Sequence, residues 1–268
     1  MSPAARPSDG GASDAGLRVA RHRAEPAGPV ALTHVTLARA GKGNSLSAAL
    51  VDELAAVLDG CEHDGTRVLL IDGDGSNFCT GFDLSNLDAE SDDSLLARFV
   101  RVELLLQRLH RAPYLTIAVA HGRTWGAGAD LFAACGQRWV RDGASFTFPG
   151  AAFGLLLGTA RLAARVGTAQ AEAWIASGAR IDEAGAVAAG LATRRLESTE
   201  PADVVAAARA LADASTRLDR ETLAAIRNAA ELRDAADDAT DLARLVRSAA
   251  RPGLRGRIQA YRLATAKR

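Results

Sequence analysis

The chain has no net charge and few cysteines, and each of these two features excludes a class of function. It also has few lysines. It carries 32 basic and 32 acidic side chains, so its formal net charge at pH 7 is zero. Without an excess of basic residues we expect no nucleic-acid partner and no binding to an anionic membrane. The three cysteines, Cys61, Cys79 and Cys135, form no CxxC pair and stand at no metal-ligand spacing. We therefore expect no metal or redox cofactor, and a reducing, cytoplasmic compartment.

Long hydrophobic runs are also missing. No apolar run approaches the ~20 residues that a membrane-spanning helix needs, and the N-terminus opens with small polar residues and proline rather than with a basic and then apolar signal. Residues 1–16 are rich in Gly, Ser, Ala and Pro without apolar periodicity, which predicts a disordered leader. The hydrophobic fraction of 48%, by contrast, is enough for a sizeable folded core.

Strand-like and helix-like segments alternate from residue 17 to residue 200, which predicts an α/β core. Residues 201–268 shift in composition to Ala, Arg and Asp with helical periodicity and no strand signals. We expect this C-terminal part to be a helical region packed on the core, serving in oligomerisation or as a lid. The sequence leaves open whether it covers its own active site or that of a neighbouring subunit.

Two segments share one anatomy, in which a buried strand leads into a glycine-bearing turn and then into a loop or helix. They are LLIDGDGSNFCTGFD at residues 69–83 and LTIAVAHGRTWGAGAD at residues 115–130. Glycine allows positive φ and close approach of a ligand, so backbone N–H groups of such turns can point outward. Two turns of this kind that meet at one oxygen would form an oxyanion hole. A phosphate-binding loop or plain tight packing are alternatives, although neither GxGxxG nor GxxxxGK[ST] occurs.

Four motifs, in order along residues 17–196, resemble those of the enoyl-CoA hydratase/isomerase (crotonase) superfamily. The segment NFCTGFDL at residues 77–84 resembles its F-x-x-G-x-D-[LI] motif, and residues 113–135 resemble its P-x-[IV]-A-x-[VI]-x-G-x-x-x-G-G-G-x-[ED]-L stretch. FTFPGAAFGLLLG at residues 146–158 resembles the F-x-x-P-E segment, and GARIDEAGAVAAGLA at residues 178–192 resembles the motif that ends in GL. An ordered set of this kind is specific for the superfamily but not for one reaction.

The resemblance implies an α/β fold, a crotonase-like spiral of ββα turns with a C-terminal helical region, assembled as a homotrimer or a dimer of trimers. It implies an acyl-CoA thioester as substrate, with coenzyme A as part of that substrate and not as a cofactor. The oxyanion donors would be the backbone N–H groups of Thr80 and Ala127. Further residues would bind the substrate, namely Lys42, Gly43, Asn44, Phe82, Asp83, Trp125, Gly128 and Gly150. Of these, Lys42 could pair with a phosphate of CoA, and Lys267 could do the same.

The chain departs from the family pattern where hydratases carry two catalytic glutamates. The first position is Asp130 and the second is Gly150, so one of the two acids is missing. Asp130 could be the remaining general acid or base, or simply a helix N-terminal aspartate. Gly150 could leave room for a larger acyl group or a water, or be filled by an aromatic side chain (Trp125, Phe148 or Phe153). A loop acid could replace the missing group, or could be solvated only: Asp83, Asp88 or Glu90.

The resemblance therefore predicts an acyl-CoA enzyme that acts through an enolate, and the reaction stays open. One carboxyl group is enough to move a proton between carbons in double-bond isomerisation, whereas efficient hydration is less well supported. The alternatives are an acyl-CoA decarboxylase and an inactive homologue that binds acyl-CoA without turnover.

Overall fold

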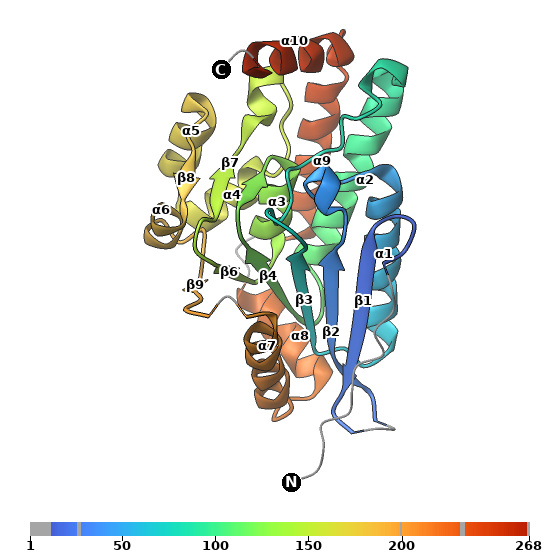
Figure 1. The fold of residues 1–268 in the computed structure, drawn as a ribbon, viewed down its shortest axis with the longest axis vertical. Helices are drawn as coiled ribbons and strands as arrows, with labels where there is room; N and C mark the ends of the chain where they lie inside the picture. Colours follow the sequence, from blue (N-terminus) through green and yellow to red (C-terminus); the bar gives the residue numbers. More distant parts are fainter. Residues whose placement is uncertain (1–11, 26–27, 199, 231–233, 267–268) are drawn as a thin grey trace.

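The computed structural model describes residues 12–25, 28–198, 200–230 and 234–266. Its larger sheet has six strands in the order β1-β2-β3-β4-β6-β9, antiparallel between β1 and β2 and parallel elsewhere. A smaller sheet has the order β5-β7-β8 (Figure 1). The strands are β1 (Leu17–Arg23), β2 (Val30–Leu37), β3 (Val68–Gly73), β4 (Leu115–Ala120), β5 (Arg123–Trp125), β6 (Gln137–Val140), β7 (Ser145–Thr147), β8 (Ile181–Asp182) and β9 (Arg194–Arg195). This mixed architecture confirms the predicted α/β fold class.

Helices follow most strands and then form the whole C-terminal part. In the core they are α1 (Ala48–His63), α2 (Asp92–His110), α3 (Ala127–Ala134), α4 (Thr159–Val166), α5 (Thr168–Ser177) and α6 (Glu183–Ala188). Three short 3-10 helices are η1 (Ala40–Lys42), η2 (Leu87–Ala89) and η3 (Pro149–Phe153). The C-terminal helices are α7 (Pro201–Ser215), α8 (Arg220–Ala230), α9 (Ala235–Ala249) and α10 (Leu254–Ala266). No helix in the described ranges is both long and apolar enough to cross a bilayer.

The central parallel strands of the larger sheet, β3 and β4, are buried on both faces, because helices cover the sheet on each side. In β3, Leu69 and Ile71 belong to the main hydrophobic cluster, whereas Val68 and Leu70 belong to a second cluster on the opposite face. Helix α7 covers that second face with small side chains spaced four residues apart, Val204, Ala208 and Ala212. The main cluster lies between the sheet and α1 to α3, and it positions the site described below.

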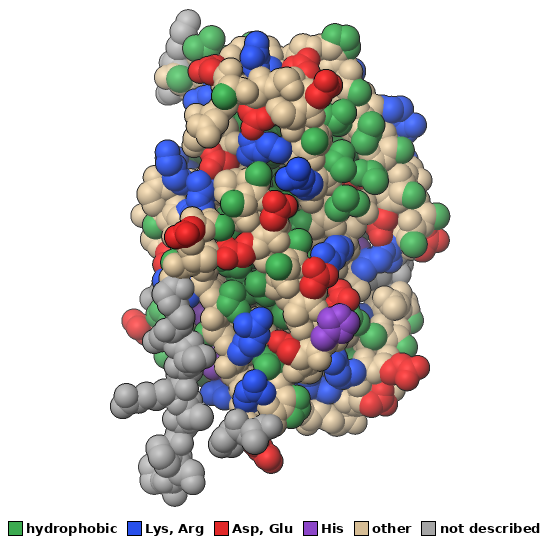
Figure 2. Space-filling view, turned by 90° about the vertical axis from the view of Figure 1, so that its right-hand side faces the viewer, with side chains coloured by type: hydrophobic (Ala, Val, Ile, Leu, Met, Phe, Trp, Pro, Cys, Tyr) green, Lys and Arg blue, Asp and Glu red, His purple; other side chains and the backbone are tan. Residues whose placement is uncertain are grey.

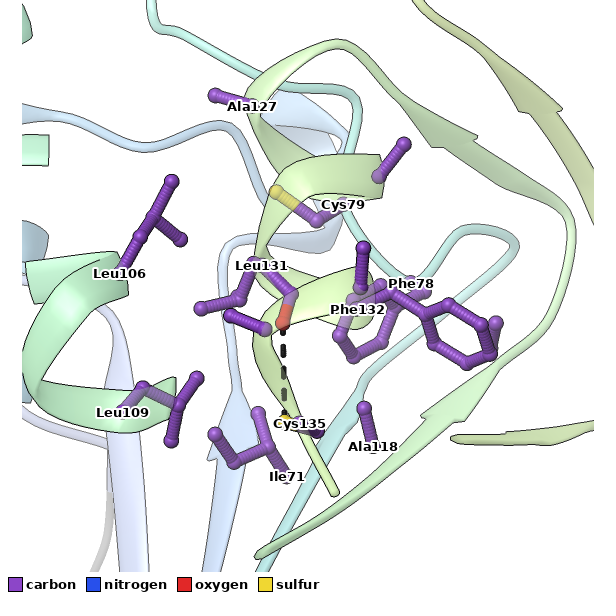
Figure 3. Packing of buried hydrophobic residues seen from close by; sticks show 14 of the residues in the cluster. Ile71, Phe78, Cys79, Leu106, Leu109, Ala118, Ala127, Leu131, Phe132 and Cys135 are labelled. Atoms are coloured by element: carbon purple, nitrogen blue, oxygen red, sulfur yellow. Dashed lines mark hydrogen bonds between the residues drawn. The ribbon is translucent and has the colours of Figure 1, made fainter. Parts of the chain in front are cut away.

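Helix α3 runs through the middle of the main cluster, and all eight of its residues are buried. In Figure 3, Leu106 and Leu109 of α2 lie on one side of it, and Phe78 and Phe132 lie together on the other. The rings of Phe78 and Phe132 meet edge to face at 6.4 Å. Tight packing of this kind fixes the position of α3, and with it every group on its first turn.

Side chains cap the starts of two core helices. Ser47 caps α1 by accepting a hydrogen bond from the N–H of Leu50, and Asp182 caps α6 by accepting one from the N–H of Gly185.

Of the predicted leader at residues 1–16, residues 1–11 lie outside the described residues. Ser13 already belongs to a turn closed by the bond from the N–H of Gly16 to its carbonyl oxygen, and its hydroxyl donates to Glu53 of α1. Ordered structure therefore begins before Leu17.

The C-terminal region is helical, as its composition predicts, and it divides between two ends of the molecule. Helix α7 packs on β2 and β3, whereas α10 lies across η3 and α2 at the opposite end (Figure 1). On the face shown in Figure 2, acidic and basic side chains are interspersed, with no patch of a single sign. That face therefore offers no extended basic surface.

Candidate active site

A pocket of about 830 Å³ lies where the two glycine-bearing segments meet. Its walls come from both segments, from η3, from the end of α5 and from α10 of the same chain. Six of the predicted site residues line it: Thr80, Phe82, Trp125, Ala127, Asp130 and Gly150. Tyr261, Ala264 and Thr265 of α10 close one side, so the C-terminal region covers its own pocket.

Backbone hydrogen bonds hold the two glycine-bearing segments side by side. The N–H of Phe78 donates to the carbonyl of His121 at 2.9 Å, and the N–H of Cys79 donates to that of Arg123 at 3.2 Å. The N–H of Trp125 returns a bond to the carbonyl of Cys79 at 3.0 Å. This short parallel ladder pairs residues 78–79 with β5 and its flanking residues, and it sets the distance between the loops.

Thr80 cannot supply the predicted oxyanion donor. Its N–H already donates to the carbonyl oxygen of Gly43 at 2.9 Å. Gly43 is packed against Thr80 so closely that a Cβ on Gly43 would lie 2.8 Å from the threonine side chain. Because this bond ties the loop to η1, the prediction for Thr80 is wrong, and Gly43 supports the loop rather than a ligand.

The free amide of this loop belongs to Phe82, two residues further on. The carbonyl of Gly81 accepts from the N–H of Leu46, and the N–H of Asp83 donates back to the carbonyl of Leu46. Phe82 lies between these two bonds, so its own N–H points away from Leu46. That N–H meets no acceptor within the described residues.

Ala127 presents the matching amide on the second loop. It is the first residue of α3, so its N–H has no acceptor within the helix, and none is found elsewhere in the described chain. The helix dipole adds partial positive charge at this end. Gly81 (φ +98°) brings the loops together, since a Cβ placed there would lie only 3.3 Å from the nitrogen of Ala127. The prediction for Ala127 fits this geometry.

Asp130 stands on the first turn of α3, and its side chain faces the pocket. It is only 5% exposed, and its carboxyl group has no hydrogen-bond partner among the residues that the structure describes. Burial raises the pKa of Asp130 well above its ordinary value. The Arg161 guanidinium lowers this pKa and the Glu103 carboxylate raises it further, but burial has the largest effect. The surroundings of Asp130 therefore favour its protonated, neutral form.

A glycine makes room for this carboxyl group. Gly158 (φ +66°) precedes α4, and a Cβ added to it would lie 2.0 Å from Oδ1 of Asp130. No side chain can occupy that position without displacing the acid. The requirement for glycine at 158 is thus both conformational and steric.

Gly150 also lines the pocket, and among the described lining residues Asp130 is the one acid. A Cβ on Gly150 would lie 3.3 Å from the carbonyl oxygen of Leu155, which is tight but needs only a small shift. All three aromatic residues considered from the sequence, Trp125, Phe148 and Phe153, line the pocket. None of the lining residues within the described ranges is Lys, Arg or His.

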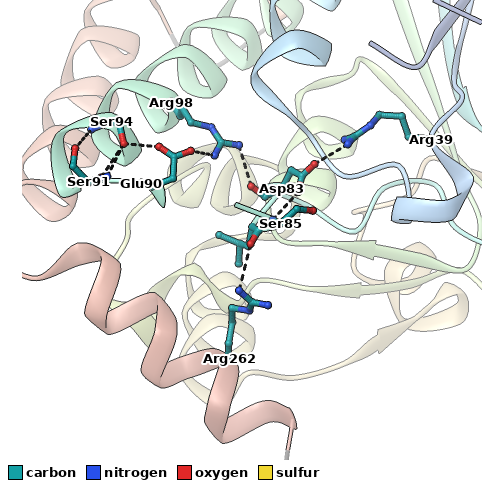
Figure 4. A network of polar contacts seen from close by, with 9 residues as sticks. Arg39, Asp83, Ser85, Glu90, Ser91, Ser94, Arg98 and Arg262 are labelled. Atoms are coloured by element: carbon teal, nitrogen blue, oxygen red, sulfur yellow. Dashed lines mark hydrogen bonds and ion pairs between the residues drawn. The ribbon is translucent and has the colours of Figure 1, made fainter. Parts of the chain in front are cut away.

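The loop acids do not replace the missing group. Asp83 pairs with Arg39 at 2.8 Å and accepts from the N–H of Ser85 (Figure 4). Although burial alone would raise it, these partners lower the pKa of Asp83 to about 2. Asp88 accepts from Gln259 of α10, and Glu90 accepts from Ser94 and Arg98 of α2. None of the three lines the pocket, so the alternative in which one of them supplies the missing acid is wrong. Asp83 supports the loop rather than a ligand.

Two further predicted binding residues, Asn44 and Gly128, lie outside the pocket. Asn44 is fully buried, and its amide accepts from the N–H of Arg39 and donates to the carbonyls of Asp74 and Asn77, so its side chain has no capacity left for a ligand. Gly128 packs on Cys79, since a Cβ there would lie 2.2 Å from the Cys79 carbonyl oxygen. Both are structural positions.

Among the residues that the structure describes, Lys42 is the one predicted CoA contact whose charge is available. It is exposed on η1, and no carboxylate of the described chain pairs with it. Its predicted role remains a prediction. Lys267 lies outside the described residues.

Known proteins resemble this chain over most of its length. Residues 28–249 match the family model described as enoyl-CoA hydratase/isomerase. A Bacillus subtilis (strain 168) protein named "Probable enoyl-CoA hydratase" is 35% identical over 190 residues, which are 68% of this chain and 72% of that protein. The ethylmalonyl-CoA decarboxylase of Xenopus laevis is 30% identical over 163 residues, 59% of this chain and 54% of that protein.

A solved structure agrees with these matches. A crystal structure of a Bordetella parapertussis protein that carries the same family name is 39% identical and superimposes with a TM-score of 0.84, covering 92% of this chain and 98% of that one. The family model, the relatives and the shared fold together show that the chain belongs to the enoyl-CoA hydratase/isomerase family.

Proposed function

We propose that the pocket binds the thioester and acyl group of an acyl-CoA, with the thioester oxygen held by the N–H groups of Phe82 and Ala127. One observation carries this proposal: two backbone amides without acceptors flank the same pocket as a buried, pocket-facing acid. Such donors stabilise negative charge on an enolate oxygen more than on the ground-state carbonyl. In other enzymes the loss of one donor costs about 3–4 kcal/mol of transition-state stabilisation.

Asp130 would then move a proton between two carbons of the substrate. Ionised Asp130 removes a proton from Cα of a 3-enoyl thioester, and the electron pair flows to the oxygen to give a dienolate. The protonated acid returns that proton to Cγ, the double bond moves into conjugation, and Asp130 is ionised again. A raised pKa suits this role, because an acid–base group works best when both protonation states are accessible at the working pH.

Hydration is the less favoured reaction of the same pocket. It requires one group to activate water while another group delivers the proton to Cα, and Gly150 offers no such group. We therefore place double-bond isomerisation first.

The walls support an uncharged acyl group. Among the residues that the structure describes, the lining is largely aromatic and aliphatic and includes no cationic side chain that would hold a second carboxylate. A cavity of about 830 Å³ has room for a medium-length chain or a ring in addition to the thioester.

Decarboxylation is a second candidate, supported by the raised pKa of Asp130 and by the decarboxylase among the similar proteins. Loss of CO2 from a malonyl-type thioester generates the enolate without a base. A neutral Asp130 could then donate the proton to Cα.

The proposal for the C-terminal region is that α10 acts as a lid over the pocket of its own chain. Arg262 donates to the carbonyl of Leu84, and Arg257 donates to that of Phe153, so α10 is tied to two pocket walls. Assembly as a homotrimer or dimer of trimers is also proposed, from the family resemblance. Light scattering of the purified protein tests it.

The test of the function is a set of three substrates assayed with wild type and Asp130→Asn. A 3-enoyl-CoA reports isomerisation as a gain of conjugated-enoyl absorbance, crotonyl-CoA reports hydration as its loss, and an alkylmalonyl-CoA reports decarboxylation as released CO2. We expect turnover of the first substrate, and at least a 10²-fold loss in Asp130→Asn with unchanged CoA-dependent thermal stabilisation. Full activity of Asp130→Asn would remove this residue from the mechanism, and silence with all three substrates would leave only acyl-CoA binding.

A further inference from the structure

Behind Asp130, away from the pocket, lies a fully buried ion pair. Arg161 of α4 donates from Nη1 to Oε1 of Glu103 at 2.8 Å and from Nη2 to Oε2 at 2.5 Å. Each side chain is only 1% exposed. Gln107 donates from Nε2 to Oε1 of Glu103 at 2.8 Å and to the carbonyl oxygen of Asp238 at 2.9 Å, so the glutamate is held on its other side as well.

The guanidinium of Arg161 is not fully used by this pair. Its Nε is buried and has no hydrogen-bond partner in the structure. Arg161 follows Gly158 by three residues at the start of α4, and Gly158 is in contact with the Asp130 carboxyl group. Asp130 and Arg161 thus lie on facing elements, one with an unpaired carboxyl group and the other with an unpaired N–H.

We propose that Glu103 and Arg161 are positioning residues for Asp130, and that Glu103 holds the guanidinium in a closed, two-bond pair that keeps Arg161 from binding the catalytic carboxyl group. Without Glu103, the buried positive charge would have Asp130 as its nearest anionic partner. A permanent ion pair would lock Asp130 in its ionised form and hold it in place. The inference rests on the proposed function of Asp130, and it assigns to the pair a role that the fold alone does not require.

The other titratable and charged groups close to α3 are paired or neutral, so Glu103 and Arg161 are the ones that affect the pKa of Asp130. Helix α3 packs against α2, α4, β4 and β5. Arg165 and His110 meet at its far end, where Arg165 donates to the carbonyl of Ala133. Arg123 of β5 stacks on the Trp125 ring, β4 carries no charged residue, and burial raises the pKa of the neighbouring Cys79 thiol to about 12, so that it stays neutral.

The experiment measures the titration of Asp130 directly, without reference to turnover. Protein labelled with ¹³C at the aspartate carboxyl carbons gives one resonance for each Asp, and Asp130→Asn identifies the one that belongs to Asp130. In Glu103→Gln the Arg161 charge loses its partner, so the acid dissociation constant of Asp130 is expected to rise by about tenfold or more. The acid limb of the pH–rate profile should move to lower pH in parallel.

Asp238→Asn is the matched control. Asp238 of α9 pairs with Arg111, the residue that follows α2, so the substitution removes a buried carboxylate from an α2–α9 contact and leaves the α2–α4 pair of Glu103 and Arg161 in place. It should leave the Asp130 titration unchanged. An equal shift in Asp238→Asn and Glu103→Gln would overturn the proposal, because the effect would then be general.

A second variant covers the case in which Glu103→Gln does not fold. In Glu103→Leu/Arg161→Met both buried charges are replaced by apolar side chains, a change that well-packed interiors often tolerate. Because Arg161 acts on Asp130 more strongly than Glu103 does, removal of both should lower the acid dissociation constant of Asp130 relative to wild type. A titration curve that superimposes on wild type in either folded variant overturns the proposal. Failure of the proposed function is seen separately, as full activity of Asp130→Asn with the NMR shifts intact.

Discussion

The contact between Gly158 and Asp130 can be tested by adding one methyl group. In Gly158→Ala the new Cβ would lie 2.0 Å from Oδ1 of Asp130, whereas a non-bonded C···O contact needs about 3.3 Å. Either the carboxyl group or the start of α4 must therefore move by about 1 Å. An error of this size in the position of a reacting group costs about 10²-fold in rate.

The stability cost has two parts that can be measured separately. Alanine in the left-handed region (φ +66° at Gly158) costs about 1–2 kcal/mol, and overpacking adds about 1–3 kcal/mol. Gly143 has φ +79° with nothing within 4 Å of the added Cβ, so Gly143→Ala measures the backbone part alone. The fall in Tm for Gly158→Ala should be two to three times that for Gly143→Ala.

A double-mutant cycle isolates the clash. In an Asp130→Ala background the atom nearest to the new Cβ is Cβ of residue 130, at 3.2 Å, so Gly158→Ala should then cost little more than Gly143→Ala. The measurements are Tm and the free energy of unfolding in urea, with kcat on the preferred enoyl-CoA. Equal losses for Gly158→Ala and Gly143→Ala in the wild-type background, with activity retained, would refute the placement of Asp130 against Gly158.

Three further predictions concern the missing acid, the loop and the CoA end. Gly150→Glu should add crotonyl-CoA hydration to the activity, because a Cβ at Gly150 needs only a small shift of Leu155; unchanged product ratios by HPLC would contradict this. Asp83 has a folded-state pKa lowered to about 2, so its contribution to stability is complete above its unfolded pKa near 4 and is lost as the pH falls toward 2. The difference in the free energy of unfolding in urea between wild type and Asp83→Asn should therefore shrink between pH 4 and pH 2. A constant difference from pH 6 to pH 2.5 would disprove this. Lys42→Ala should raise the Kd for CoA about 2–5-fold at low salt and less at high salt, measured by calorimetry, whereas a salt-independent effect would exclude a charge contact.

The sequence predicts the elements of the site better than their detailed roles. Apolar runs and glycine turns correctly indicate two strand-loop segments, and the structure brings both to one pocket. They do not indicate which amide is free. In extended chain the N–H groups of alternate residues point the same way, yet both Thr80 and Asp83, three residues apart, bond to the segment of residues 43–46.

Gly81 causes this departure from the regular pattern. Its φ of +98° reverses the direction in which the following N–H groups point, so the N–H of Phe82 faces away from the segment of residues 43–46. A dihedral angle of one glycine thus decides between the two candidates, and a sequence cannot supply it. Asn44 and Asp83 were misassigned for a related reason, since their polar side chains are used up by loop contacts with Arg39, a residue that no motif marks.

The buried pair of Glu103 and Arg161 was detectable in part. The apolar stripe of α2 includes Phe99, Val102 and Leu106, and Glu103 falls on the same buried face. A carboxylate at a core position requires a buried cation, and Arg161, beside Leu162 in the short α4, is a cation at such a position. The sequence could therefore have indicated that these two oppositely charged core residues form a pair. Their place behind Asp130 could not, because it follows from the close approach of α3 and α4 at Gly158, and that approach depends on how the rest of the core packs around α3.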